Sequence, residues 1–354
     1  MTARYRVFMF LLCLSLPAFA RQNASASAEP ETALSHESEI TLNVVVTDRA
    51  GKPVTGLQQQ DFTVLDNKKP QAIVTFKAVQ QDVATGEPAA KVILLVDEVN
   101  ASYQSVAYER DQIKKFLQMN DGKLTQPVSL GFFSDNGTVI QAGATRDGKA
   151  LLTAFEENKN GLRSSRRSQG YWGAAERYQS SLATLSSLAE REASEPGRKL
   201  LVWISPGWPL LSGPNVLMTQ SVQRGIFRSI VKLTAQLRRA DATLYMVDPL
   251  GASASLTGQF YYESFVKGVA SDKEVQSGNL ALQVLSIQSG GLVLNASNDI
   301  ASRIARAAND ANAYYMLSMK IPPVEHPDEY HSVQVKVNRP GLIVRTRTGY
   351  YAQP

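Results

Sequence analysis

The sequence is almost without cysteine. The only one among 354 residues, Cys13, lies in an N-terminal segment with the layout of a bacterial secretory signal peptide: Arg4 and Arg6, then an apolar run, then Ala18-Phe-Ala20 before the expected cleavage point. Removal of residues 1–20 leaves no thiol, which excludes disulfides, thiolate metal sites and cysteine nucleophiles from the mature chain. The segment predicts a secreted or periplasmic protein.

Long apolar runs and a strong excess of one charge are also absent. After the signal peptide, no stretch approaches the roughly 20 apolar residues that a membrane-spanning helix needs, so we expect no membrane span. The formal net charge is +5, and Arg4 and Arg6 leave with the signal peptide. So small a charge on a chain of this length does not indicate a nucleic-acid partner.

Residues that carry catalysis are scarce. The three histidines, His36, His326 and His331, are not placed to serve as the base of a catalytic triad, and the nucleophile-elbow and zinc-protease motifs are missing. Residues 143–150 come close to a phosphate-binding loop, but Ala150 stands where the Mg²⁺-binding hydroxyl belongs. We therefore expect no catalytic residues and no nucleotide or other organic cofactor.

The chain divides into segments with different patterns. Residues 21–37 show no apolar period and predict a disordered lead-in, whereas residues 38–82 and 313–354 consist of short alternating segments typical of β-strands. Between them, residues 88–312 alternate strand-like runs with helical periods. This pattern predicts an α/β fold with a doubly wound, mostly parallel, six-stranded sheet. The two flanking β segments are expected to pair into one small β-sandwich-like domain.

The most informative stretch is the run Lys91-Val-Ile-Leu-Leu-Val-Asp97. A continuous apolar run predicts a strand that is buried on both faces, and parallel sheets bind ligands beyond the carboxyl ends of their strands. Asp97, Asn100 and Ser102 share the following loop, and their oxygens suit Mg²⁺ or Ca²⁺. The same residue types commonly cap a helix or fix a loop by hydrogen bonding, so the sequence leaves both interpretations open.

The strand that ends in Asp97, the parallel pattern and the hairpin signal Asn136-Gly137 resemble the von Willebrand factor type A fold over about residues 88 to 320. With the leading β segment and the closing residues 347–351, Arg-Thr-Gly-Tyr-Tyr, the whole chain resembles the bacterial type A-related proteins described from acidobacteria. The resemblance implies a Rossmann-like sheet and a metal-ion-dependent adhesion site, whose motif after the first strand is Asp-x-Ser-x-Ser.

Only part of that motif is present in this chain. Asp97 matches the first aspartate, but Val99 and Ala101 occupy the two serine positions. Pro206 stands where the family has a later aspartate, so the resemblance implies a degenerate site with few anionic ligands. Asp248, which follows another predicted strand, is the nearest substitute carboxylate.

Two further segments indicate a contact surface at the same edge of the sheet. The loop that holds Arg163, Arg166 and Arg167 concentrates guanidinium groups, which suit an acidic partner. Ser205 and Trp208 follow a later strand, and an exposed tryptophan near arginines is typical of an interface hot spot. A solvated arginine loop and a tryptophan that packs into the core are the alternatives.

Together these features predict an exported, non-enzymatic protein-interaction or adhesion-type module with a degenerate metal site, whose partner is a protein or a cell-surface component. Two alternatives stay open. The first is a metal-assisted hydrolase that uses Asp97, and the second is a scaffold component that binds through its β domain. The metal separates the first alternative from the main prediction, because only the hydrolase requires an occupied cation site.

Overall fold

The computed structural model describes residues 39–81, 89–101, 103–141, 143–158, 170–209, 211, 218–249, 261–295 and 297–352. The predicted signal peptide and the whole predicted lead-in lie outside these ranges. All the helices and strands belong to one unit, residues 37–354. Within the described ranges, no helix combines the length and the apolar character needed to cross a bilayer.

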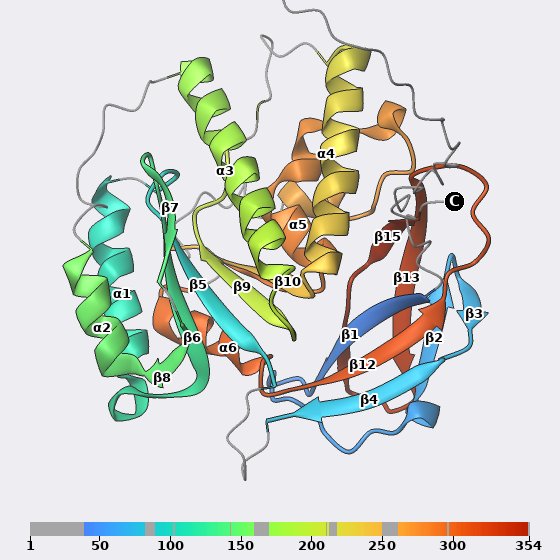
Figure 1. Ribbon diagram of the computed structural model, residues 1–354, viewed down its shortest axis with the longest axis horizontal. Helices are drawn as coiled ribbons and strands as arrows, with labels where there is room; N and C mark the ends of the chain where they lie inside the picture. Colours follow the sequence, from blue (N-terminus) through green and yellow to red (C-terminus); the bar gives the residue numbers. More distant parts are fainter. Residues whose placement is uncertain are drawn as a thin grey trace, which may run out of the picture. The chain divides into compact units, whose positions relative to one another are not determined.

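A mostly parallel sheet forms the α/β part (Figure 1). Its strand order is β11-β10-β9-β5-β6-β7, in which β7 is antiparallel to β6 and the other strands are parallel. A further short strand, β8, pairs with β6. The strands are β5 (Lys91–Asp97), β6 (Lys123–Ser134), β7 (Gly137–Ile140), β8 (Thr145–Asp147), β9 (Lys199–Ile204), β10 (Ala242–Val247) and β11 (Val293–Leu294). The predicted fold class is confirmed.

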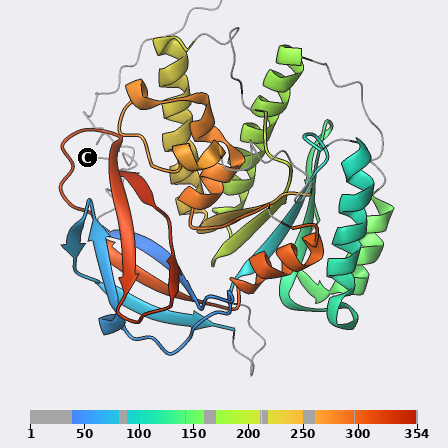
Figure 2. The same cartoon turned by 180° about the vertical axis from the view of Figure 1, so that it is seen from behind.

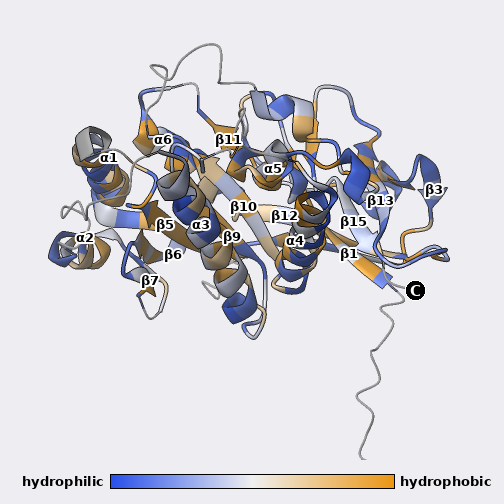
Figure 3. Cartoon of the chain, turned by 90° about the horizontal axis from the view of Figure 1, so that it is seen from above, coloured by the Kyte–Doolittle hydropathy of each residue, from blue (hydrophilic) through white to orange (hydrophobic). Residues whose placement is uncertain are grey.

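Helices cover both faces of this sheet because both faces of its strands are apolar. In β5, Val92, Leu94 and Val96 pack with residues of α1, α2 and α6 (Figure 2), whereas Ile93 and Leu95 pack with residues of α3, α4 and α5. Seen from above, the apolar strands lie between the helices (Figure 3). The α-helices are α1 (Tyr103–Gly122), α2 (Gly148–Glu157), α3 (Gly170–Glu192), α4 (Gln220–Arg239), α5 (Leu282–Gln288) and α6 (Ile300–Asn309), and the 3₁₀ turns are η1 (Gln59–Asp61), η4 (Tyr261–Phe265), η5 (Asp272–Glu274) and η6 (Ser277–Leu280).

The flanking β segments form two antiparallel sheets, with orders β14-β1-β12-β4 and β15-β13-β2-β3. Both contribute to one apolar cluster, so they pack on each other, as the sequence predicts. The pairing of β1 with β12 joins the two ends of the chain. The division into separate domains stays a prediction. The strands are β1 (Glu39–Thr47), β2 (Phe62–Asp66), β3 (Lys69–Gln71), β4 (Thr75–Gln80), β12 (Ala313–Lys320), β13 (Glu329–Val337), β14 (Ile343–Arg345) and β15 (Gly349–Ala352).

Two local features differ from the sequence pattern. Alternation predicts a hairpin between residues 62–65 and 73–76, but β2 pairs with β3, and β4 pairs with β12 in the other sheet. The positive φ angles of Asn67 and Lys68 close a tight two-residue turn, which ends the hairpin earlier than a longer loop would. The apolar period over residues 275–288 predicts one helix, whereas the 3₁₀ turn η6 occupies residues 277–280 and the α-helix α5 begins only at Leu282.

A buried polar network joins the α/β part to the antiparallel sheets. The Asp310 carboxylate accepts a hydrogen bond from the Tyr245 hydroxyl (2.8 Å) and pairs with the Arg345 guanidinium (2.7 Å). Its backbone carbonyl accepts from Arg198 (3.0 Å), whose guanidinium lies over the Tyr314 ring. The partners come from β9's amino end, β10 and β14, so this one residue connects three elements that are distant in sequence.

Replacement of Asp310 by alanine should destabilise the protein strongly. It leaves the Arg345 side chain, which is 14% exposed, without its counter-charge, and breaking such a buried pair costs about 3–5 kcal/mol. Urea unfolding at neutral pH measures the loss. Asp111→Ala removes an exposed pair with Lys115 and is the matched control, with a much smaller expected loss because solvent screens that pair. Equal losses in the two variants would contradict a structural role of the network.

Candidate functional site

The carboxyl ends of three neighbouring parallel strands bring polar residues together. Asp97 ends β5, Ser205 follows β9, and Asp248 follows β10, and all three side chains are buried. The helix α1, which follows β5, and the helices α3 and α4, which lead into β9 and β10, begin at the same edge. We call this edge the carboxyl-end rim; it comprises residues 97–101, 103–108, 134–139, 170–173, 205–209, 218–222 and 248–249.

The Asp97 carboxylate is the centre of the rim, and it accepts five hydrogen bonds. One oxygen accepts from the backbone N–H groups of Val99 (3.0 Å) and Asn100 (2.8 Å). The other accepts from the Asn100 side-chain amide (2.9 Å), the Trp203 indole N–H (3.1 Å) and the Ser205 hydroxyl (2.7 Å). Asp97 is 0% exposed. Its carboxylate therefore fixes the loop after β5 and ties it to β9.

Of the three predicted metal ligands, the structure describes Asp97 and Asn100, which hydrogen bond to each other. Asn100 directs its amide nitrogen at Asp97, and a nitrogen that donates a hydrogen bond is not a cation ligand. Ser102 lies outside the described residues. Among the residues that the structure does describe, no group of three or more His, Cys, Asp or Glu side chains could hold a metal ion. The geometry agrees with the loop-fixing interpretation, and the cation role of Asp97, Asn100 and Ser102 stays a prediction.

Three more acids lie near Asp97 and are also buried. Glu98 is within 3.9 Å of the Arg110 guanidinium, and Asp248 is 6% exposed. Glu109, on α1, is 1% exposed, and its carboxyl oxygens make no hydrogen bond within the part of the chain described. The sequence signal for Glu109 was available: it occupies the buried helical stripe that contains Val106 and Ile113.

Burial controls the protonation of these acids. Desolvation raises the pKa of Asp97, while its hydrogen bonds from Asn100, Ser205 and Trp203 act in the opposite direction. Desolvation raises the pKa of Glu109 well above its usual range, and the negative charges of Asp97 and Glu98 raise it further. Folding therefore favours the protonated form of Glu109.

Of the five residues predicted to bind a partner, the structure describes two, and both are buried. Arg163, Arg166 and Arg167 lie outside the described residues. Ser205 is 0% exposed and is engaged with Asp97. Trp208 is 5% exposed and packs edge-on against the Trp203 ring, at 5.2 Å between centroids, so it forms part of the core. A partner contact by these five residues stays a prediction.

The exposed aromatic side chains of the rim are ones that the sequence pattern did not single out. Trp172 is 79% exposed, and Tyr171 beside it is 43% exposed, with ring centroids 5.5 Å apart. Further along α3, Ser181 hydrogen bonds to Asn100 and so lies level with the loop after β5. At 1.5 Å per residue, Trp172 lies about 13 Å beyond that level, on the projecting end of the helix (Figure 1).

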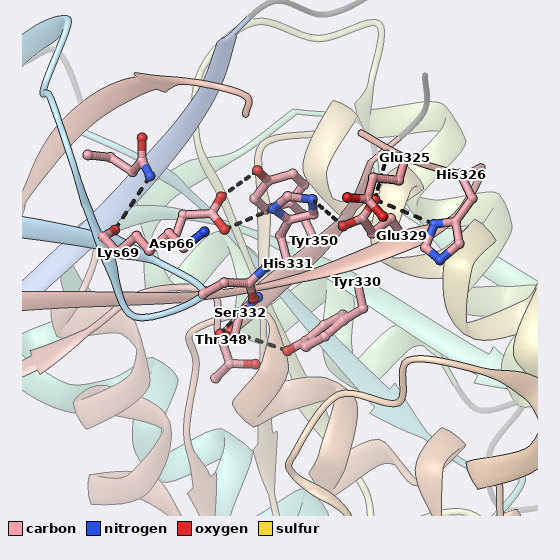
Figure 4. Close-up of polar contacts among 12 residues, drawn as sticks. Asp66, Lys69, Glu325, His326, Glu329, Tyr330, His331, Ser332, Thr348 and Tyr350 are labelled. Atoms are coloured by element: carbon pink, nitrogen blue, oxygen red, sulfur yellow. Dashed lines mark hydrogen bonds and ion pairs between the residues drawn. The ribbon is translucent and has the colours of Figure 1, made fainter. Parts of the chain in front are cut away.

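A second polar cluster, in the antiparallel sheets, contains a buried histidine (Figure 4). His331 Nδ1 lies 2.8 Å from Asp66, whose other oxygen accepts from the Tyr350 hydroxyl at 2.6 Å. His331 Nε2 faces Glu329 at 3.6 Å and has no hydrogen-bond partner in the described part of the chain. The imidazole stacks on the Tyr350 ring.

This arrangement contains the aspartate–histidine pair of many hydrolases, in a setting that differs from theirs. His331 is 2% exposed, so a substrate cannot reach Nε2 unless the strands separate. Asp66, His331 and Tyr350 come from β2, β13 and β15, and their contacts link these strands. The cluster therefore acts as a cross-link between strands.

No protein-family model matches the sequence, and no curated protein matches it. Similar solved structures include a human COPII-coat protein, a mutant of the PilB minor pilin from Streptococcus sanguinis and the pilus adhesin SpaC from Lactobacillus rhamnosus GG in an open conformation. Their identities are 8%, 11% and 9%, their TM-scores are 0.35, 0.33 and 0.35, and the matches cover 75%, 64% and 83% of this chain. This chain covers 44%, 64% and 48% of those chains, which is less than two thirds of each.

The raised pKa of Glu109 predicts a pH dependence of stability. Above its ordinary pKa of 4.5, the unfolded chain loses this proton while the folded chain keeps it, so the free energy of unfolding falls as pH rises toward the folded-state pKa. Glu109→Gln removes this effect. We expect the variant to gain stability relative to wild type as pH increases from 5 to 8, roughly the range in which a raised carboxyl titrates.

Denaturant unfolding across this range measures the difference. Glu156→Gln is the matched control, because it removes an acid whose side chain is 52% exposed on α2. Stability curves of wild type and Glu109→Gln that stay parallel over the whole range would contradict the prediction.

Proposed function

We propose that this chain is an exported, non-enzymatic protein-interaction or adhesion-type module that contacts a protein or cell-surface component through the carboxyl-end rim. The observation that carries the proposal is the exposed pair Tyr171 and Trp172 at the projecting start of α3. The predicted export signal supports the location of the partner outside the cytoplasm.

Exposed aromatic side chains of this size need a physical reason. A tryptophan that is 79% exposed leaves a large apolar surface in water, and tryptophan and tyrosine dominate the energetics of protein interfaces. Further exposed apolar side chains belong to the same rim: Tyr108 (42%), Val139 (65%), Met218 (37%) and Val222 (41%). Such a collection around one edge supports a contact surface.

The state of Asp97 supports contact without a cation. In a metal-dependent adhesion site the carboxylate must leave oxygens free for the ion, because Mg²⁺ and Ca²⁺ bind through oxygen ligands. Here both oxygens are occupied by donors from the protein. A partner would therefore meet the aromatic pair above the loop, and the carboxylate would act indirectly by holding that loop in place.

The aromatic pair is open to a direct test. Trp172→Ala should weaken partner binding by about tenfold or more, because hot-spot tryptophans contribute at least that much. Pull-down from the native envelope fraction would supply the partner, and the affinity would then be measured with purified proteins. The side chain is exposed, so thermal unfolding should change little.

Ile343→Ala provides the matched control for this test. Ile343 is also an exposed apolar side chain, at 43%, but it lies on β14 of the antiparallel sheets. Loss of binding in Ile343→Ala together with full binding in Trp172→Ala would overturn the proposal and favour the scaffold alternative, in which the β sheets make the contact.

The hydrolase alternative is tested with metal ions. A cation at ten times its dissociation constant would raise the free energy of unfolding by about 1.4 kcal/mol. We expect Mg²⁺, Mn²⁺ and Ca²⁺ to produce no saturable heat and no such stabilisation, because both Asp97 oxygens already accept hydrogen bonds from the protein. Calorimetric titration and thermal unfolding, with a chelator as the reference, measure both. Saturable cation binding that the Asp97→Asn substitution abolishes would favour the hydrolase alternative over the proposed function.

A further inference from the structure

A large groove lies along α6, where this helix meets the antiparallel sheets. Its volume is about 870 Å³, which is within the range of small-molecule and short-peptide sites. The walls come from the turn after β1, the end of β4 and one side of α6. Figure 2 shows α6 in front of the parallel sheet, leading toward β12. The groove shares no lining residue with the carboxyl-end rim.

Three cationic side chains line this groove. Lys52 is exposed in the turn after β1, and Arg303 and Arg306 lie one turn apart on the same side of α6. Within the described ranges, none of the three side chains forms a hydrogen bond or an ion pair. Gly51 makes room for one of them, because a β-carbon at this position would contact the Arg306 guanidinium group.

The acid in the lining, Asp299, is already engaged. It caps α6, where its carboxylate accepts from the Ser302 backbone N–H (3.1 Å) and the Ser302 hydroxyl (2.6 Å). These two hydrogen bonds lower the pKa of Asp299. The positive charge of Arg303 also lowers the pKa of Asp299, but Asp299 forms no ion pair with Arg303 or Arg306 within the described residues. Three cationic side chains therefore line the groove beside one carboxylate, which leaves an excess of positive charge.

Side-chain amides at the groove form a connected set of hydrogen bonds, and three of these residues, Gln81, Asn309 and Asn312, line the groove. The Gln126 amide nitrogen donates to the oxygens of Gln81 (3.1 Å) and Asn312, and Asn312 in turn donates to the Asn309 oxygen at 3.3 Å. In this network the side-chain oxygens of Gln81, Asn309 and Asn312 accept hydrogen bonds within the protein, whereas Gln126 Oε1 has no partner in the described part of the chain. The side-chain N–H groups of Gln81 and Asn309, which line the groove, are donors that a ligand can meet.

We propose that this groove binds an anionic ligand that carries at least two carboxylate or phosphate groups. The guanidinium groups of Arg303 and Arg306 match such oxyanions, which they bind through paired N–H donors, and Lys52 adds a point charge from the opposite wall. The amide donors of Gln81 and Asn309 satisfy further oxygens. The site is independent of the proposed contact through the rim, and nothing in it requires a metal.

Calorimetry with the full mature chain at about 20 mM salt tests the proposal, because screening weakens such contacts at higher ionic strength. The probes are citrate, pyrophosphate and a hexaglutamate peptide. We expect saturable one-to-one binding of at least one probe. Preference for pyrophosphate assigns a phosphate-bearing ligand, whereas preference for citrate or the peptide assigns a small or an extended carboxylate ligand.

The double variant Arg303→Gln/Arg306→Gln should weaken that binding by at least about tenfold. The matched control is Arg224→Gln/Arg228→Gln, which removes the same charge from two exposed arginines on α4, near Asp272 and Asp328. The control should bind as wild type does, and circular dichroism verifies that both variants fold. Absence of saturable binding by all three probes, or an equal loss in the two variants, would overturn the proposal.

Discussion

The carboxyl-end rim depends on one buried carboxylate. Five donors from the protein surround Asp97 and replace the water that an ionised group loses on burial. A hydrogen bond left unmade at such a group costs about 1–3 kcal/mol, so the loop after β5 has little freedom to move away. Asp97 is thus fully buried and holds the loop in place by hydrogen bonding.

This burial decides which chemistry the rim offers to a partner. Asp97, Glu98 and Glu109 are all beneath the surface, and their mutual repulsion is relieved in part by the protonation of Glu109. Tyr171 and Trp172 are among the rim side chains that reach solvent. Aromatic contact needs neither a metal nor a proton transfer, and this division between buried acids and exposed rings is the physical basis of the proposed interaction.

Charge is divided in a similar way where α6 meets the antiparallel sheets. Asp310 follows the helix and is neutralised by Arg345 within the buried network that joins β14 to the α/β part. Arg303 and Arg306, on the open side of the same helix, have no such partner among the described residues. Paired charges thus stabilise the junction, while unpaired charges beside it remain for an external anion.

Local patterns in the sequence specify the elements and their order. The apolar run at 91–97, the helical periods and the β segments at each end predict the parallel sheet and the pairing of the two chain ends. The chemistry of Asp97 depends instead on long-range packing, because Trp203 and Ser205, which occupy one of its oxygens, lie 106 and 108 residues further along the chain. Trp208 and Trp172 show the same limit: composition does not reveal which tryptophan packs against Trp203 and which projects into solvent, since burial depends on contacts between distant segments.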